Sequence, residues 1–204
     1  MKILAIKVLE FIGNSLWGFR PNLMKDIVEI HGGWKSIIWF AKNMPKYERV
    51  MKKIGSERTH LLAVAISGIN GCQYCTYGHA LSFHLHYFKN KKQLFPIDEQ
   101  EMMKFNTKNE QQIIDTLNNA FDATGLVQEK EDLQRLIDLK DNPDLATSEN
   151  DHRINHLVHM FGFLNMCGIK NQTLPDSAHD PINKNSKLYQ QYQKAKSLKN
   201  STIV

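Results

Sequence analysis

The segment from Glu57 to Ile69 constrains the fold most, because it is apolar on nearly every side of a helix. It contains the run Leu61-Leu62-Ala63-Val64-Ala65-Ile66. A helix that is apolar all round must be covered on all sides by other elements. Ser56 is a suitable N-cap before it, and Asn70-Gly71 is a pair typical of a helix end. We therefore expect a central buried helix that the rest of the chain surrounds.

Further helices are predicted to supply that cover. Only 11 glycines and 6 prolines occur among 204 residues, and residues with high helix propensity are frequent. Apolar residues recur at helical spacing in segments that span about 21–31, 34–44 (ending before Pro45), 72–89, 113–121, 133–139 and 148–168, with a short helix capped by Asp98 and Glu101. No segment reads as a strand. The expected fold class is all-α, a helical bundle with a single domain over 1–170.

Residues 171–204 are predicted to form a polar, basic C-terminal extension. We expect a loop to about residue 185 and then a weak, exposed helix, since lysines crowd the sequence there. Lysine runs of this kind are usually solvated. A nucleic-acid site would need aromatic or arginine anchors along a basic stripe, and the tail offers only Tyr189 and Tyr192. We therefore predict no nucleic-acid partner.

The cysteine content and the N-terminus indicate a cytoplasmic protein. Three cysteines are an odd number, whereas disulfide scaffolds of secreted proteins carry even, denser sets. Lys7 and Glu10 interrupt the apolar N-terminus, and no small-residue cleavage site follows. No segment has the ~18 uninterrupted apolar residues of a membrane span. We predict no membrane contact.

Self-association is expected from the excess of apolar surface. The amphipathic N-terminal helix and Trp34, Trp39 and Phe40 offer more apolar face than a core of this size needs. Helical chains with such faces usually bury them against copies of themselves. The chain is therefore predicted to form an oligomer.

The chemistry is predicted to lie in the segment Asn70-Gly71-Cys72-Gln73-Tyr74-Cys75-Thr76-Tyr77-Gly78-His79. Steps of three and four residues place Cys72, Cys75 and His79 on one face of a helix. Cys72 would stand at the helix N-terminus, which stabilises a thiolate. His79 can take a proton from Cys75, and sulfurs in adjacent turns can form a disulfide. The pattern supplies a nucleophile, a resolving thiol and a base.

Other interpretations of these and the remaining candidate residues stay open. A zinc site would take Cys72, Cys75 and His79 with His60 or His86, but structural zinc usually uses two knuckles in loops. We therefore predict neither a metal nor a cofactor. Five further residues receive structural interpretations: Cys167 as a buried apolar residue, His84 as a surface histidine, and the trio His152, His156 and His159 as a solvated helix face. Tyr74 is either a pocket donor or a packed ring.

The stretch from Ser56 to Ala80 resembles the AhpD-like alkylhydroperoxidase family of the carboxymuconolactone decarboxylase superfamily. The resemblance rests on the apolar helix, the Asn-Gly break, the Cys-x-x-Cys pair and His79. It implies an AhpD-like all-α bundle that assembles as a homotrimer or homohexamer. It also implies that Cys75 attacks a peroxide and that Cys72 resolves the product. The helix-terminus argument alone would have favoured Cys72 as the more acidic thiol.

One position departs from the family pattern. The family usually has a glutamate twelve residues before the first cysteine, as a proton relay to the histidine, and His60 occupies that position here. Glu57 lies one turn earlier on the same helix face. Either His60 and Glu57 together replace the relay, or the relay is lost. Each also has a structural explanation, His60 as a core histidine and Glu57 as a first-turn acid.

The expected function is that of a thiol-dependent peroxidase or thiol–disulfide oxidoreductase. Its catalytic residues would be Cys75, Cys72, His79, His60 and Glu57. Its partners would be a peroxide, a dithiol reductant such as a lipoyl or thioredoxin-like protein, and copies of itself. The alternatives are a decarboxylase of the same superfamily, whose chemistry does not call for a cysteine pair, and a metal-binding or structural protein with a vestigial redox site.

Overall fold

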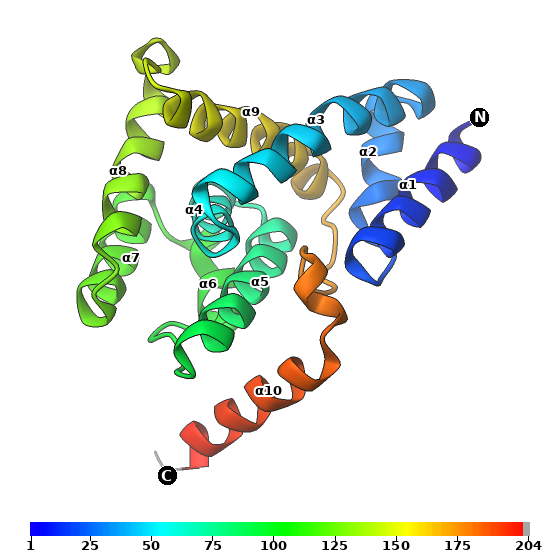
Figure 1. The fold of residues 1–204 in the computed structure, drawn as a ribbon. Helices are drawn as coiled ribbons and strands as arrows, with labels where there is room; N and C mark the ends of the chain where they lie inside the picture. The colour runs from blue at the N-terminus through cyan, green and yellow to red at the C-terminus, as the bar shows by residue number, and fades with distance from the viewer. Residues whose placement is uncertain (202–204) are drawn as a thin grey trace.

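Helix α4 (Ser56–Ile69) lies at the centre of the molecule in the computed structural model, which describes residues 1–201 (Figure 1). Every residue from Thr59 to Gly68 is buried, as the all-round apolar pattern predicts. The helix begins without a side-chain cap from Ser56, which is already its first residue. It ends at Asn70, and Gly71 has the left-handed φ of 83° that favours glycine. The chain then turns directly into α5 (Gln73–Lys91), which packs along α4.

The remaining helices surround this pair. The order is α1 (Lys2–Trp17), α2 (Leu23–His31), α3 (Gly33–Ile54), α4, α5, α6 (Glu99–Met103), α7 (Glu110–Thr124), α8 (Val127–Asp141), α9 (Glu149–Lys170) and α10 (Ser186–Ser201), with 3₁₀ turns η1 (Lys104–Thr107), η2 (Pro143–Leu145) and η3 (Pro181–Lys184). Residues 1–201 contain no strand. The all-α class is therefore confirmed. Among these residues, no helix combines the length and apolar character that a membrane crossing requires.

Several helix ends follow their sequence signals. Asp98 and Glu101 form a capping box at the start of α6, and Ser148 forms one with Asp151 at the start of α9. Gly125 closes α7 in the left-handed conformation. Local capping interactions therefore set the starts of α6 and α9 and the end of α7.

Helix α3 is longer than the sequence predicts, because it continues through Pro45 to Ile54. A proline inside a helix removes one hydrogen bond and costs about 3 kcal/mol. The residues on either side keep one buried face at helical spacing, namely Phe40, Met44, Tyr47, Val50, Met51 and Ile54. Burial of that face outweighs the cost of the proline.

The C-terminal extension packs against α5 more closely than its composition predicts. Leu188 and Tyr192 of α10 are buried against Leu81, Leu85 and Phe88 in a second, smaller apolar cluster. His84, which we expected on the surface, is only 2% exposed. The Tyr192 ring stacks on it, with ring centroids 6.0 Å apart. The spacing within α5 gave no sign of this, because the cover comes from a helix a hundred residues later.

Candidate functional site

The cysteine pair stands where α4 gives way to α5. Cys72 is the N-cap of α5, and its sulfur accepts a hydrogen bond from the backbone N–H of Cys75 at 3.4 Å. Both thiols are free and buried. The Cys72 sulfur packs tightly against Gly168 of α9, where an added Cβ would lie 2.8 Å from it. The pair is therefore held between two helices, away from solvent.

The two thiols differ in acidity. A hydrogen bond from the Cys75 thiol lowers the pKa of Cys72, and backbone N–H groups of Cys75 and Tyr74 add to this effect against the opposing cost of burial. Burial raises the pKa of Cys75 well above the ordinary thiol value, and the neighbouring Cys72 raises it further. Cys72 is therefore the more acidic thiol of the reduced pair, as the helix-terminus argument favoured.

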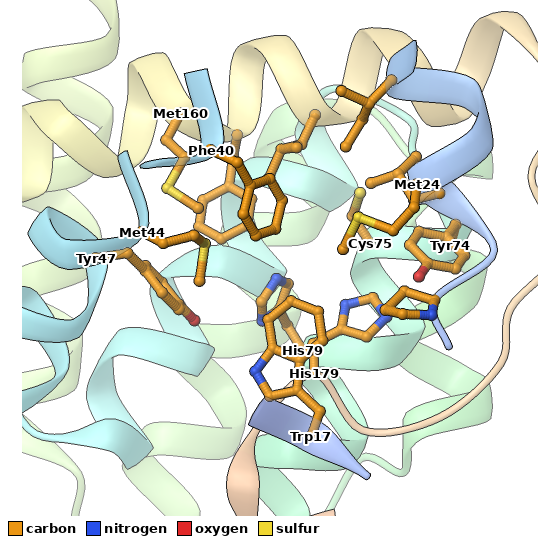
Figure 2. Close-up of a pocket in the computed structure, with 15 residues that line it drawn as sticks. Trp17, Met24, Phe40, Met44, Tyr47, Tyr74, Cys75, His79, Met160 and His179 are labelled. Carbon is orange, nitrogen blue, oxygen red and sulfur yellow. The ribbon is translucent and has the colours of Figure 1, made fainter. Parts of the chain in front are cut away.

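Cys75 nevertheless lines a cavity that Cys72 does not reach. The cavity has a volume of about 40 Å³. Its polar lining consists of Tyr47, Tyr74, His79 and His179, and apolar side chains such as Phe40, Met44 and Met160 form the rest. Figure 2 shows Cys75, His79 and His179 around this space, with Trp17 beside the two histidines. A water-sized group needs at least ~10–15 Å³ by this measure, so the cavity accepts only a few small atoms.

His79 is held by a chain of buried polar groups that ends in the C-terminal extension. His79 Nδ1 lies 3.0 Å from His60 Nδ1, and His60 Nε2 lies 2.9 Å from a carboxylate oxygen of Asp180. Tyr47 Oη approaches the same His60 Nδ1 more loosely, at 3.5 Å. His60 is 0% and Asp180 4% exposed. This series of polar contacts therefore runs from the cavity to the Asp180 carboxylate, which lies 120 residues after His60 in sequence.

These contacts fix the tautomer of each ring. Burial would raise the pKa of Asp180, but hydrogen bonds from His60 and His86 outweigh it and hold that pKa well below the ordinary value. The ionised carboxylate needs a donor, so His60 carries its proton on Nε2 and its Nδ1 is an acceptor. His79 must then donate from Nδ1, which leaves its Nε2 as a free acceptor.

Both rings are neutral at pH 7. Burial lowers the pKa of His79 well below its usual value, and the neighbouring His179 and His60 lower it further. Burial also lowers the pKa of His60, although Asp180 partly opposes it. A neutral imidazole that lines the same cavity as a thiol can act as a general base rather than as a fixed cation.

His179, which belongs to the C-terminal extension, is the second histidine in the cavity wall. His179 lies 3.2 Å from Asp176 through Nε2, and Tyr74 Oη donates to the same carboxylate at 3.0 Å. The His179 ring stacks on Trp17 and meets His79 edge-on, with centroids 5.9 and 5.2 Å away. Tyr74 is thus both a packed ring and a pocket residue.

Not every predicted site residue joins this arrangement. Glu57 accepts a hydrogen bond from Asn90 at 2.9 Å on the exposed side of α4, whereas the polar partners of His60 are Tyr47, His79 and Asp180 among the described residues. The structure thus brings Cys72, Cys75, His79 and His60 together and leaves Glu57 outside.

Other candidates lie apart from the cavity. Cys167 is fully buried, and burial raises its pKa to about 11. His152 and His159 are exposed and His156 is half-buried on α9.

Three functional candidates were missed from the sequence: Asp176, His179 and Asp180. They fall in a polar stretch that we expected to be a loop, about a hundred residues after the cysteine pair. The one available signal was a histidine–aspartate dipeptide with another aspartate three residues earlier. Nothing in helical spacing connects such a loop to α5.

Comparisons of the chain with protein-family models, with curated proteins and with solved structures find no match. A helical fold hosts many activities, so function must be argued from the site itself. The site offers a thiol pair, a small cavity and a histidine whose free nitrogen is set by a buried carboxylate.

Proposed function

We propose that this protein is an AhpD-like, thiol-dependent peroxidase that works in the cytoplasm. The observation that supports it most is the joint lining of one small cavity by Cys75 and His79, with His79 oriented through His60 and Asp180. A hydroperoxide needs room for two oxygen atoms at the sulfur, and the cavity provides a space of that order. Its apolar walls favour a neutral peroxide over a charged substrate.

The catalytic cycle has an oxidation step at Cys75 and a condensation step that forms the disulfide. The Cys75 thiol loses its proton to His79 or to Cys72, and the thiolate attacks the terminal peroxide oxygen. The O–O bond breaks, the proton returns to the departing oxygen as an alcohol or water, and Cys75 becomes a sulfenic acid. The Cys72 thiolate then attacks the Cys75 sulfur and forms the disulfide, and the departing hydroxide takes a proton from solvent and leaves as water. A dithiol reductant restores the pair and is itself oxidised to a disulfide.

The acidity of Cys72 suits a resolving role beside a buried peroxidatic thiol. As a thiolate, Cys72 can take up the Cys75 proton through the sulfur–sulfur hydrogen bond. Once that proton has passed to the departing oxygen, Cys72 is again a thiolate and can attack the Cys75 sulfenic acid. Both sulfurs are at most 2% exposed, so reduction by a lipoyl or thioredoxin-like protein requires local opening near α2 and the 171–185 segment.

The experiment follows the products on each sulfur. The reduced protein is treated with one equivalent of hydrogen peroxide or a small alkyl hydroperoxide and analysed by mass spectrometry. The wild type is expected to form the Cys72–Cys75 disulfide, and Cys72→Ser a sulfenic acid on Cys75. A stable sulfenic acid on Cys72 in Cys75→Ser, with none on Cys75 in Cys72→Ser, would exchange the two roles. Unreacted thiols throughout would reject the peroxidase function.

We also propose that the protein self-associates as a trimer or hexamer through α1 and the start of α3. Phe11 and Trp34 are 70% and 62% exposed, and Ile3, Leu4 and Ile38 are exposed as well. Trp39 and Phe40, in contrast, pack against the core. Light scattering is expected to show an oligomer for the wild type and a monomer for Phe11→Glu. A wild-type monomer at micromolar concentration would reject the proposed self-association.

A further inference from the structure

Three possible metal ligands converge on the Nε2 side of the His60 ring, opposite the nitrogen that contacts His79. His60 Nε2 and His86 Nε2 lie 2.9 and 3.1 Å from the two carboxylate oxygens of Asp180. The three donor atoms lie within 4.8 Å of one another. Donors bound about 2.1 Å from a common ion lie about 3.0–3.4 Å apart. A small inward movement of the rings would therefore place an ion between them.

The donor set and its burial suit a first-row divalent ion. Two imidazole nitrogens and one carboxylate bind zinc, cobalt and iron well. His60 is rigidly buried on α4, Asp180 precedes η3, and the His86 side chain on α5 is 17% exposed. Two fixed ligands and one that can adjust form a partly preorganised site.

A surface groove reaches two of these ligands, His86 and Asp180. The groove, with a volume of about 500 Å³, is lined by His86, Asp180 and Glu48 together with Lys52 and Lys89. The Glu48 and Asp180 carboxylates therefore line the same groove. Two neighbouring carboxylates repel each other unless a cation lies near them. Glu48, or water in the groove, is thus available to complete the coordination beside the two lysines.

Metal binding at His60 would change the tautomer of His79. An imidazole that binds an ion through Nε2 carries its proton on Nδ1. His60 Nδ1 would then donate across the 3.0 Å contact to His79 Nδ1. His79 would have to accept there and carry its own proton on Nε2. The nitrogen that serves as base in the metal-free protein would lose its free lone pair.

We propose that His60, His86 and Asp180 form a binding site for a divalent transition-metal ion, and that its occupation switches His79 from base to non-base. The switch rests on the function proposed above, whereas the binding site does not. Metal would inhibit peroxide reduction without touching either cysteine.

Binding is tested with cobalt(II) as the probe, added to chelator-treated, reduced, full-length protein and followed by its visible absorption. The wild type is expected to bind one ion per chain. His86→Ala is expected to weaken binding about 100-fold or more. Two control variants are expected to bind cobalt as the wild type does: His152→Ala, which removes an exposed histidine, and the Cys72→Ala/Cys75→Ala double variant. Binding that survives in His86→Ala and disappears in the cysteine variant would overturn the site, as would no binding at all.

The switch is tested by nitrogen NMR of the His79 ring with and without zinc(II), which needs no enzymatic activity. The ring proton is expected to move from Nδ1 to Nε2 in the wild type and in the cysteine double variant, and to stay on Nδ1 in His86→Ala. Metal binding that leaves the His79 ring unchanged would overturn the switch. A protein that fails to reduce peroxide yet passes both tests would reject the proposed function and leave this site standing.

Discussion

At the scale of single residues, Cys72 and Cys75 share one proton between sulfurs with different surroundings. The Cys75 thiol donates to Cys72 and stabilises its thiolate, while burial keeps Cys75 protonated. Each sulfur thus depends on the other for its charge state, and a change at Cys75 should be measurable at Cys72.

Replacing Cys75 by alanine is expected to raise the pKa of Cys72. The reason is that the Cys75 thiol donates to the Cys72 thiolate, and a hydrogen bond to a charged group contributes about 1.5–3 kcal/mol. Thiolate absorbance titrated against pH measures it. Cys167→Ala is the control, because that buried thiol makes no hydrogen bond to Cys72. An unchanged titration in Cys75→Ala would contradict the shared proton.

Gly78 is a second residue where atomic contact matters. The His179 ring lies directly over it, and an added Cβ would come within 2.3 Å of that ring. Gly78→Ala is expected to displace His179 and lower the free energy of unfolding by about 1–3 kcal/mol. Gly162→Ala, where a Cβ meets nothing within 4 Å, should be neutral or stabilising by up to ~1 kcal/mol. Equal urea midpoints for the two variants would show that the contact is unimportant.

At the scale of elements, α10 acts as a cover for α5. The hydroxyl of Tyr192 donates to Glu99, its ring lies on His84, and the side chain is 1% exposed. Tyr192→Ala is expected to lower the free energy of unfolding by about 3–5 kcal/mol. Tyr189→Ala, on the exposed side of the same helix, should change it by less than ~0.5 kcal/mol. Urea unfolding distinguishes the two, and similar effects would mean that α10 is not docked.

The elements also show what the sequence could predict. The central helix, the capping box of Asp98 and Glu101, and the common face of Cys72, Cys75 and His79 all follow from local pattern, and each was predicted. The course of α3 past Pro45 and the burial of Tyr192 depend on tertiary packing, which local pattern does not carry. The same holds for Asp180, whose partners lie on α4 and α5. Sequence reasoning therefore pointed to the two thiols and to His79, left the role of Glu57 open and missed Asp180.

At the scale of the whole molecule, three buried histidines make stability depend on pH. Burial lowers the pKa of His60, His79 and His84, the last to about 4. The unfolded chain takes up protons on these rings below its ordinary pKa of about 6.5, whereas the folded chain does not until lower pH. Stability is therefore fully present above pH ~6.5 and falls as the pH drops towards 4.

Urea unfolding between pH 7.5 and pH 4 measures this effect. His84 alone is expected to contribute a loss of the order of 2–3 kcal/mol. His84→Leu should flatten that part of the curve, since its Nε2 has no hydrogen-bond partner among the described residues. A wild-type free energy of unfolding that stays level from pH 7 to pH 4.5 would contradict the burial of neutral histidines.

The central claim is that the relay behind His79 ends at Asp180 rather than at Glu57. The measurement is the rate of peroxide-driven thiol loss in metal-free Asp180→Asn and Glu57→Gln, each compared with the wild type. An amide at 180 no longer holds His60 in the required tautomer, and a similar loss of tautomer control in a serine protease triad lowers the rate about 10⁴-fold. We predict a loss of about 10²–10⁴-fold in Asp180→Asn and less than about twofold in Glu57→Gln. A normal rate in Asp180→Asn would contradict the account.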